Sequence, residues 1–117
     1  MRDGRAEESD ESVALVLTTV PHGVSGEELV RKLLEERRIA CGNLVPGVSS
    51  LYHWEGSITS DSEVLVLLKV RASRVGELFG RIAELHPYTV PELLELPVSG
   101  VSSAYRQWVM QSSEVSE

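Results

Sequence analysis

The stretch EVLVLLKV, Glu63–Val70, places apolar side chains on both sides of an extended chain. Because side chains alternate between the two faces of a strand, Val64 and Val66 share one face while Leu65 lies on the other. The run VALVLTTV, Val13–Val20, has the same two-sided character. We therefore predict that both segments are strands of a sheet whose two faces are apolar.

Two segments with helical periodicity separate the predicted strands. The first helix is predicted from about Glu27 to Arg38, after a Ser-x-x-Glu capping box that begins at Ser25. The second is predicted to have Ser73 as its N-cap and to end at His86-Pro87, because proline cannot continue a helical ladder. Its apolar stripe comprises Val75, Leu78, Phe79, Ile82 and Leu85.

A long hairpin is predicted between the two helices. The segment Asn43–Gly56 is extended, with a bend at Pro46-Gly47 that is typical of a bulge on an edge strand. The polar stretch Ser57–Ser62 is predicted to turn the chain back into the apolar strand that follows. At about 3.3 Å per residue, the segment from Leu44 to Trp54 would extend roughly 36 Å, so we expect its tip to project beyond the core.

The order of elements predicts the fold. A last extended segment, Glu92–Val98, precedes a short C-terminal helix, Ser103–Gln111. Strand, helix, strand, strand, helix, strand is the order of the split βαβ sandwich. We predict an α+β, ferredoxin-like fold with an antiparallel sheet in the strand order 4-1-3-2, a long β-hairpin arm and a short C-terminal helix. Residues 1–12 are predicted to be a disordered acidic extension, 13–111 the domain and 112–117 a C-terminal tail.

The apolar character of both sheet faces predicts an oligomer. Two helices and a short third helix cannot cover both faces of four strands, and the apolar surface left over requires a partner. The arm that carries Leu51, Tyr52 and Trp54 is the element expected to pair with the edge strand of a neighbouring copy. The alternative is that the C-terminal helix, with Trp108, covers the second face alone.

Composition limits the classes of partner. The chain has 117 residues, 42% of them hydrophobic and 25% charged, as expected of one globular domain. It has neither the roughly 20 consecutive apolar residues of a membrane span nor the pattern of a signal peptide, and its single cysteine, Cys41, suits the reducing cytoplasm. A net charge of -7, with Lys32 and Lys69 as the only lysines, disfavours nucleic acid. We expect a cytoplasmic protein with no nucleic-acid or membrane partner.

Cys41 and His86 are candidate metal ligands. A thiolate and an imidazole suit copper or zinc, and Cu²⁺ binds most tightly among the divalent ions. The alternatives are a packing role for Cys41 and an interaction of His86 with the last carbonyls of its helix. In the predicted sheet the two residues begin opposite edge strands, roughly 14 Å apart at about 4.8 Å per strand. They could therefore share a metal only across a subunit boundary.

The segment from His86 to Glu92 is a candidate wall of a ligand-binding cleft. Two prolines stiffen it, and it presents Tyr88 and Glu92 next to the end of the strand that carries Lys69. In such a cleft Lys69 could hold a small anion or serve acid-base chemistry. The alternative is a surface ion pair of Lys69 with Glu92 or Glu63. Tyr52 and Trp54, at i and i+2, are expected to pack in an interface rather than to stack on bases.

Several segments together resemble the CutA divalent-cation-tolerance family, in order from about Val13 to Val109. They are IACGNLVPG (Ile39–Gly47), SLYHWEG (Ser50–Gly56), Leu68-Lys69, ELHPYTVPE (Glu84–Glu92) and Tyr105-x-x-Trp108. The resemblance implies a ferredoxin-like homotrimer whose arms exchange edges around a three-fold axis. It also implies association with copper and other divalent cations, with Cys41 and His86 at the positions of proposed ligands.

The resemblance further implies an inter-subunit cleft formed by Lys69, Tyr88, Glu92 and Trp54. Some relatives carry another cysteine near the end of the first strand, where this chain has Thr18 and Thr19. We therefore expect copper, or another divalent cation, to be held only weakly.

Three functions follow from these observations as hypotheses. The first is a trimeric divalent-cation (copper) binding protein of the cation tolerance type. The second is a signalling module that resembles the trimeric nitrogen-regulatory PII proteins and binds a small anionic effector in inter-subunit clefts. The third is an enzyme that uses Lys69 and Glu92.

Overall fold

Four strands and three α-helices follow one another in the predicted order in the computed structural model, which describes residues 11–114. The elements are β1 (Val13–Pro21), α1 (Ser25–Glu35), β2 (Cys41–Trp54), β3 (Ser57–Arg71), a 3-10 turn (Ala72–Arg74), α2 (Val75–Leu85), β4 (Leu94–Pro97) and α3 (Ser103–Ser112). The strands form one antiparallel sheet in the order β2-β3-β1-β4. This order confirms the predicted α+β, ferredoxin-like arrangement.

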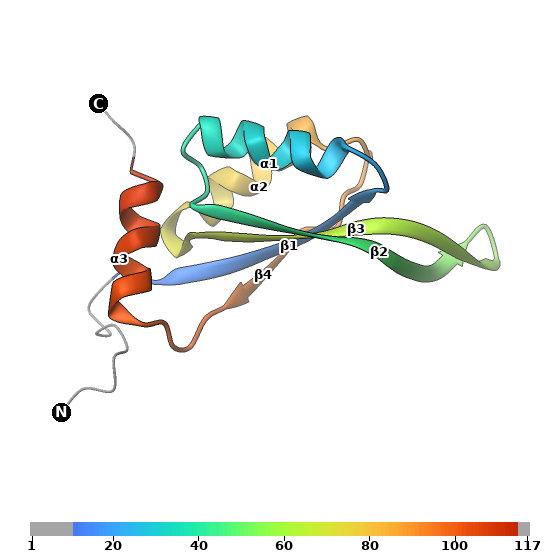
Figure 1. Cartoon of the computed structure of the whole chain (residues 1–117). Helices are drawn as coiled ribbons and strands as arrows, with labels where there is room; N and C mark the ends of the chain where they lie inside the picture. The colour runs from blue at the N-terminus through green and yellow to red at the C-terminus, as the bar shows by residue number, and fades with distance from the viewer. Residues whose placement is uncertain (1–10, 115–117) are drawn as a thin grey trace.

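The core lies between the sheet and the two longer helices. Helices α1 and α2 lie side by side over one face of the sheet (Figure 1). The side chains that β1 and β3 direct toward these helices are fully buried, among them Val16, Val66 and Leu68. Burial of such side chains contributes about 1.5–3 kcal/mol each. This face therefore supplies most of the stability of the single chain.

The opposite face of the sheet is contacted by a helix of residues 11–114 only at one end, where Val109 of α3 packs with Val13 and Ala40. We call this face the open face. Two rows of register partners run across it. They are Cys41–Lys69–Leu15–Leu96 and Asn43–Leu67–Leu17–Leu94. Leu94 and Leu96 are 50% and 39% exposed. Helix α3 stands at one end of the sheet (Figure 1), so the alternative in which it covers the second face is wrong.

The arm is longer on its return strand than predicted. Glu55 and Gly56 both have positive φ angles, 49° and 82°, which is the backbone of a two-residue hairpin turn. The polar stretch Ser57–Ser62 was predicted to be the turn, and this is wrong because it forms the first part of β3. The predicted bulge is confirmed, with a register shift between Val45 and Val48. The arm projects beyond the helices (Figure 1).

The predicted helix caps are wrong for α1 and α2. Ser25 lies inside α1, and its hydroxyl donates to the carbonyl of Pro21 at 3.3 Å. Ser73 lies in the 3-10 turn, where its hydroxyl donates to the carboxylate of Glu11. Helix α1 also ends before Arg38, since Arg37 adopts a φ of 58°. None of the helices in residues 11–114 is long and apolar enough to cross a membrane.

The ends of the described chain contact the domain. The predicted extension and tail lie outside the described residues except for 11–12 and 112–114. Ser12 accepts a hydrogen bond from the amide of Ala72 at 2.9 Å, and Glu11 forms an ion pair with Arg71 at 3.2 Å. Ser113 is buried, and its hydroxyl donates to a helix carbonyl at 2.6 Å. These residues fasten both ends of the chain near the end of β3.

Candidate functional site

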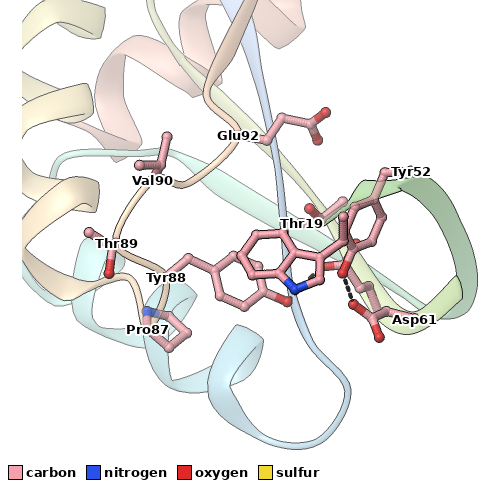
Figure 2. Close-up of a pocket in the computed structure, with 10 residues that line it drawn as sticks. Thr19, Tyr52, Asp61, Pro87, Tyr88, Thr89, Val90 and Glu92 are labelled. Atoms are coloured by element: carbon pink, nitrogen blue, oxygen red, sulfur yellow. Dashed lines mark hydrogen bonds between the residues drawn. The ribbon is translucent and has the colours of Figure 1, made fainter. Parts of the chain in front are cut away.

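A cavity of about 600 Å³ opens where the base of the arm, the end of β1 and the loop after α2 meet (Figure 2). This volume lies within the range of about 300–1,000 Å³ that is usual for small-molecule sites. Its lining residues are Thr19, Tyr52, Trp54, Asp61, Glu63, Pro87, Tyr88, Thr89, Val90 and Glu92. We refer to this space as the arm-base cavity.

The arm-base cavity is acidic. Asp61, Glu63 and Glu92 line it, and its wall contains no lysine, arginine or histidine. Glu63 is only 6% exposed, and it takes part in none of the ion pairs formed within residues 11–114. A carboxylate withdrawn from water without a positive partner favours a cation beside it. The cavity of one chain is therefore suited to cations and not to anions.

Two tyrosines donate hydrogen bonds to these carboxylates. The Tyr88 hydroxyl donates to Oε2 of Glu63 at 2.6 Å, and the Tyr52 hydroxyl donates to Asp61. Burial, followed by the hydrogen bond to Glu63, raises the pKa of Tyr88 well above its usual value. The hydrogen bond to Asp61 similarly raises the pKa of Tyr52. Both phenols therefore remain protonated donors at neutral pH.

His86 holds the loop that carries Tyr88. Its Nε2 lies 2.9 Å from the carbonyl oxygen of Thr19 and 3.3 Å from Oγ1 of Thr18, while Nδ1 accepts a hydrogen bond from the Tyr88 amide at 3.0 Å. An acceptor at Nδ1 and a carbonyl beside Nε2 fit the neutral ring with its proton on Nε2. With both nitrogens engaged, His86 acts in this structure as a positioning residue for Tyr88. A metal could bind it only by replacing one of these hydrogen bonds.

Cys41 and Lys69 face each other at the far end of the sheet. They are register partners on the open face, and the Lys69 Nζ lies 4.0 Å from the Cys41 Sγ. The same ammonium donates to Oδ1 of Asn43. The predicted surface pairs of Lys69 with Glu63 or Glu92 are therefore not formed. Six residues separate Lys69 from Glu63 on one strand, about 20 Å at 3.3 Å per residue, so Lys69 lies outside the arm-base cavity.

The structure brings together part of the predicted site. Trp54, Tyr88 and Glu92 line one cavity, as the predicted cleft requires, but Lys69 does not join them. Cys41 lies on the open face, whereas His86 contacts Thr18, whose side chain is fully buried on the helix-covered face. Within residues 11–114 no three His, Cys, Asp or Glu side chains gather closely enough to hold a metal ion. A shared metal between Cys41 and His86 remains a prediction about more than one chain.

Two cavity residues were missed by sequence reasoning. The sequence predicts Asp61 in a turn and Glu63 as an ion-pair partner of Lys69. Their i, i+2 spacing puts both carboxylates on one face of β3, and this could have indicated an acidic patch at the base of the arm. Prediction of the hairpin turn at the wrong position concealed that signal.

Comparison with known proteins identifies the family. The sequence model of the family described as CutA1 divalent ion tolerance protein matches residues 14–112. The chain belongs to the CutA1 family. Among solved structures, CutA1 from Pyrococcus horikoshii has a TM-score of 0.84 and 41% identity, with 87% of this chain and 99% of that chain covered. The shared fold agrees with the ferredoxin-like topology described above.

Curated relatives carry the same family name. A divalent-cation tolerance protein CutA from Thermus thermophilus is 38% identical over 99 residues, which cover 85% of this chain and 96% of the relative. A chloroplastic protein CutA from Arabidopsis thaliana is 40% identical over 111 residues, which cover 93% of this chain but 61% of the relative. The chain thus spans about three fifths of the length of the plant protein. Because that relative is named chloroplastic, a cytoplasmic location for this CutA1 chain remains a prediction.

Proposed function

We propose that this CutA1 protein is a cytoplasmic homotrimer that binds divalent cations, copper among them, weakly and at subunit boundaries. The observation that carries the proposal is the open face of the sheet. Leucines from β1, β3 and β4 lie on it in register, those of β1 and β3 are only partly buried, and Leu94 and Leu96 are exposed. Apolar surface of this extent is typical of a protein interface. Other copies of the chain are the partners that we propose.

The arm supports the same proposal. Leu51, Trp54 and Ile58 are 68%, 61% and 72% exposed, although each is a large apolar side chain. A two-stranded ribbon that projects into water has marginal stability of its own. We therefore propose that the arms pair with neighbouring copies through Leu51, Tyr52 and Trp54.

The proposed cation site involves more than one chain. Cys41 is partly exposed on the open face, which the proposal places at a subunit boundary, and its sulfur is a suitable ligand for copper. His86 would have to exchange a hydrogen bond for the metal. Loss of that bond reduces the net gain on binding, in keeping with a weakly held cation.

A copper titration tests the proposed ligands. We expect weaker binding of Cu²⁺ in Cys41→Ser and His86→Ala than in the natural protein, measured by calorimetry. His53→Ala is the matched control, because His53 is an exposed imidazole on the arm. Submicromolar binding that is unchanged in both Cys41→Ser and His86→Ala would remove these residues from the proposal.

The two other hypotheses receive less support. An anionic effector would meet three carboxylates in the arm-base cavity, so it would need a positive group from a neighbouring copy. Lys69 is the candidate that the family resemblance implies. An enzyme that uses Lys69 with Glu92 meets the same obstacle within one chain. A thermal-shift screen of anionic metabolites tests the first hypothesis, because a ligand at 100 times its Kd adds about 2.7 kcal/mol of stability.

A further inference from the structure

We propose that the turn between β3 and α2 is a phosphate-binding site, which the carboxylate of the chain's own Glu11 occupies in this structure. The ligand is a small phosphate-bearing molecule that displaces this carboxylate. The site lies at the end of the sheet where α3 stands (Figure 1), away from the arm, and it includes neither of the proposed copper ligands. The proposal therefore stands independently of the proposed function.

Two side chains at this turn already bind an oxyanion. Oε2 of Glu11 accepts a hydrogen bond from Nη1 of Arg71 at 3.2 Å, and Oε1 accepts one from the Ser73 hydroxyl. A phosphate group, like a carboxylate, presents neighbouring oxygens to such donors, and arginine is well suited to both groups. Phosphate carries the larger negative charge, about -1.5 to -2 at neutral pH. The same two donors should therefore hold phosphate more strongly than a carboxylate.

The turn lies in a positively charged corner of a protein whose net charge is -7. Arg71 and Arg74 both donate hydrogen bonds to Ser113, the first residue after α3. Arg74 also donates to the carbonyl oxygen of Arg37 at 2.9 Å. Among the described residues Arg37 forms no ion pair, and Arg74 pairs only with Glu77, whose side chain is 67% exposed. The positive charge of this corner favours a ligand with more than one negative charge.

Glu11 can leave the site without disturbing the sheet. It precedes β1, whose pairing with β3 begins at Val13. The side chains of Arg71 and Glu11 are 23% and 32% exposed, and ion pairs that water reaches contribute little to stability. Arg71 keeps its position when Glu11 leaves, because its other nitrogens donate to Met110 and Ser113 at 2.6 and 3.2 Å. The donors are therefore already in place for a replacement oxyanion.

Calorimetric titration with inorganic phosphate and with methyl phosphate, at constant ionic strength, tests the proposal on the full chain. Glu11→Ala removes the competing carboxylate and should tighten binding of the preferred probe by about fivefold, or about 1 kcal/mol, the upper end for exposed ion pairs. Glu27→Ala is the control, because it removes a carboxylate that pairs with Arg31 at 3.3 Å on α1 and changes the net charge equally. It should bind phosphate as the natural protein does. The probe that binds more tightly identifies the ligand as the free ion or as an ester.

Two variants made in the Glu11→Ala background locate the site. Arg71→Gln and Ser73→Ala should each remove most of the gain in affinity. Ser73→Ala keeps the test decisive if Arg71→Gln does not fold, because Ser73 is exposed and its hydroxyl bonds to Glu11. The proposal would be overturned if Glu11→Ala bound neither probe or bound both as the natural protein does. An equal gain in Glu27→Ala, or full affinity after Ser73→Ala, would overturn it as well.

Discussion

The hydrogen bond from Tyr88 to Glu63 should contribute measurably to stability, and Tyr88→Phe removes only its donor. Hydrogen bonds to charged groups contribute about 1.5–3 kcal/mol. Because Glu63 is 6% exposed, loss of this hydrogen bond should lower the free energy of unfolding substantially. The adjacent cavity, however, lets water reach the position left by the Tyr88 hydroxyl, which reduces that loss. We therefore expect Tyr88→Phe to lower the free energy of unfolding by about 1.5–2 kcal/mol, toward the lower end of the range.

Urea unfolding at pH 7 and one fixed protein concentration measures this loss, since the stability of an oligomer depends on concentration. A double-mutant cycle with Glu63→Gln isolates the charged part of the bond, and Tyr88→Phe should cost less in that background. Tyr105→Phe is the control, because Tyr105 is 37% exposed and stacks on Trp108 with ring centroids 5.6 Å apart. A cost below about 0.5 kcal/mol for Tyr88→Phe, the range of neutral surface changes, would refute the reasoning.

Two further predictions concern packing and pH. Gly42→Ala should destabilise the protein by about 1–3 kcal/mol, because its Cβ would lie 2.6 Å and 2.9 Å from the two γ-methyl groups of Val30. Gly76→Ala in α2, where nothing lies within 4 Å of the added Cβ, should instead stabilise it by about 0.5–1 kcal/mol; urea unfolding that gave both changes the same sign would contradict this account. Hydrogen bonds from Arg81 and, to a smaller extent, Arg38 lower the pKa of Glu36 from 4.5 to about 2. The ionised Glu36 carboxylate therefore stabilises the folded protein above pH 4.5, and this stabilisation is lost as the pH falls toward 2. We expect the urea midpoint to fall less between pH 5 and pH 2.5 in Glu36→Gln than in the natural protein, and equal falls would argue against this pairing.

The element order and the open face were predictable from sequence because they depend on local periodicity. The two-sided strand Glu63–Val70 and the apolar stripe of α2 need no knowledge of distant partners. The caps at Ser25 and Ser73 could not be assigned in this way. The Ser25 hydroxyl donates to the Pro21 carbonyl, and the Ser73 hydroxyl donates to the Glu11 carboxylate, instead of accepting a hydrogen bond from a backbone amide at a helix start.

The site was predicted less completely because it depends on register across the sheet. Trp54, Tyr88 and Glu92 were predicted to meet, and they do. Lys69 was predicted to lie beside them at the end of its strand, but six strand residues place it at the other end of the open face from Glu63. The acidic character of the cavity followed only once the hairpin turn was located at Glu55-Gly56.

Sedimentation equilibrium of the natural protein at low micromolar concentration tests the central proposal most directly. If the open face is covered by other copies of the chain in the proposed homotrimer, the measured mass should be three times the 12.9 kDa of one chain. Leu17→Asp and Leu67→Asp, which place charge on the open face, should shift the mass toward one chain. A compact monomer of the natural protein under these conditions would contradict the account.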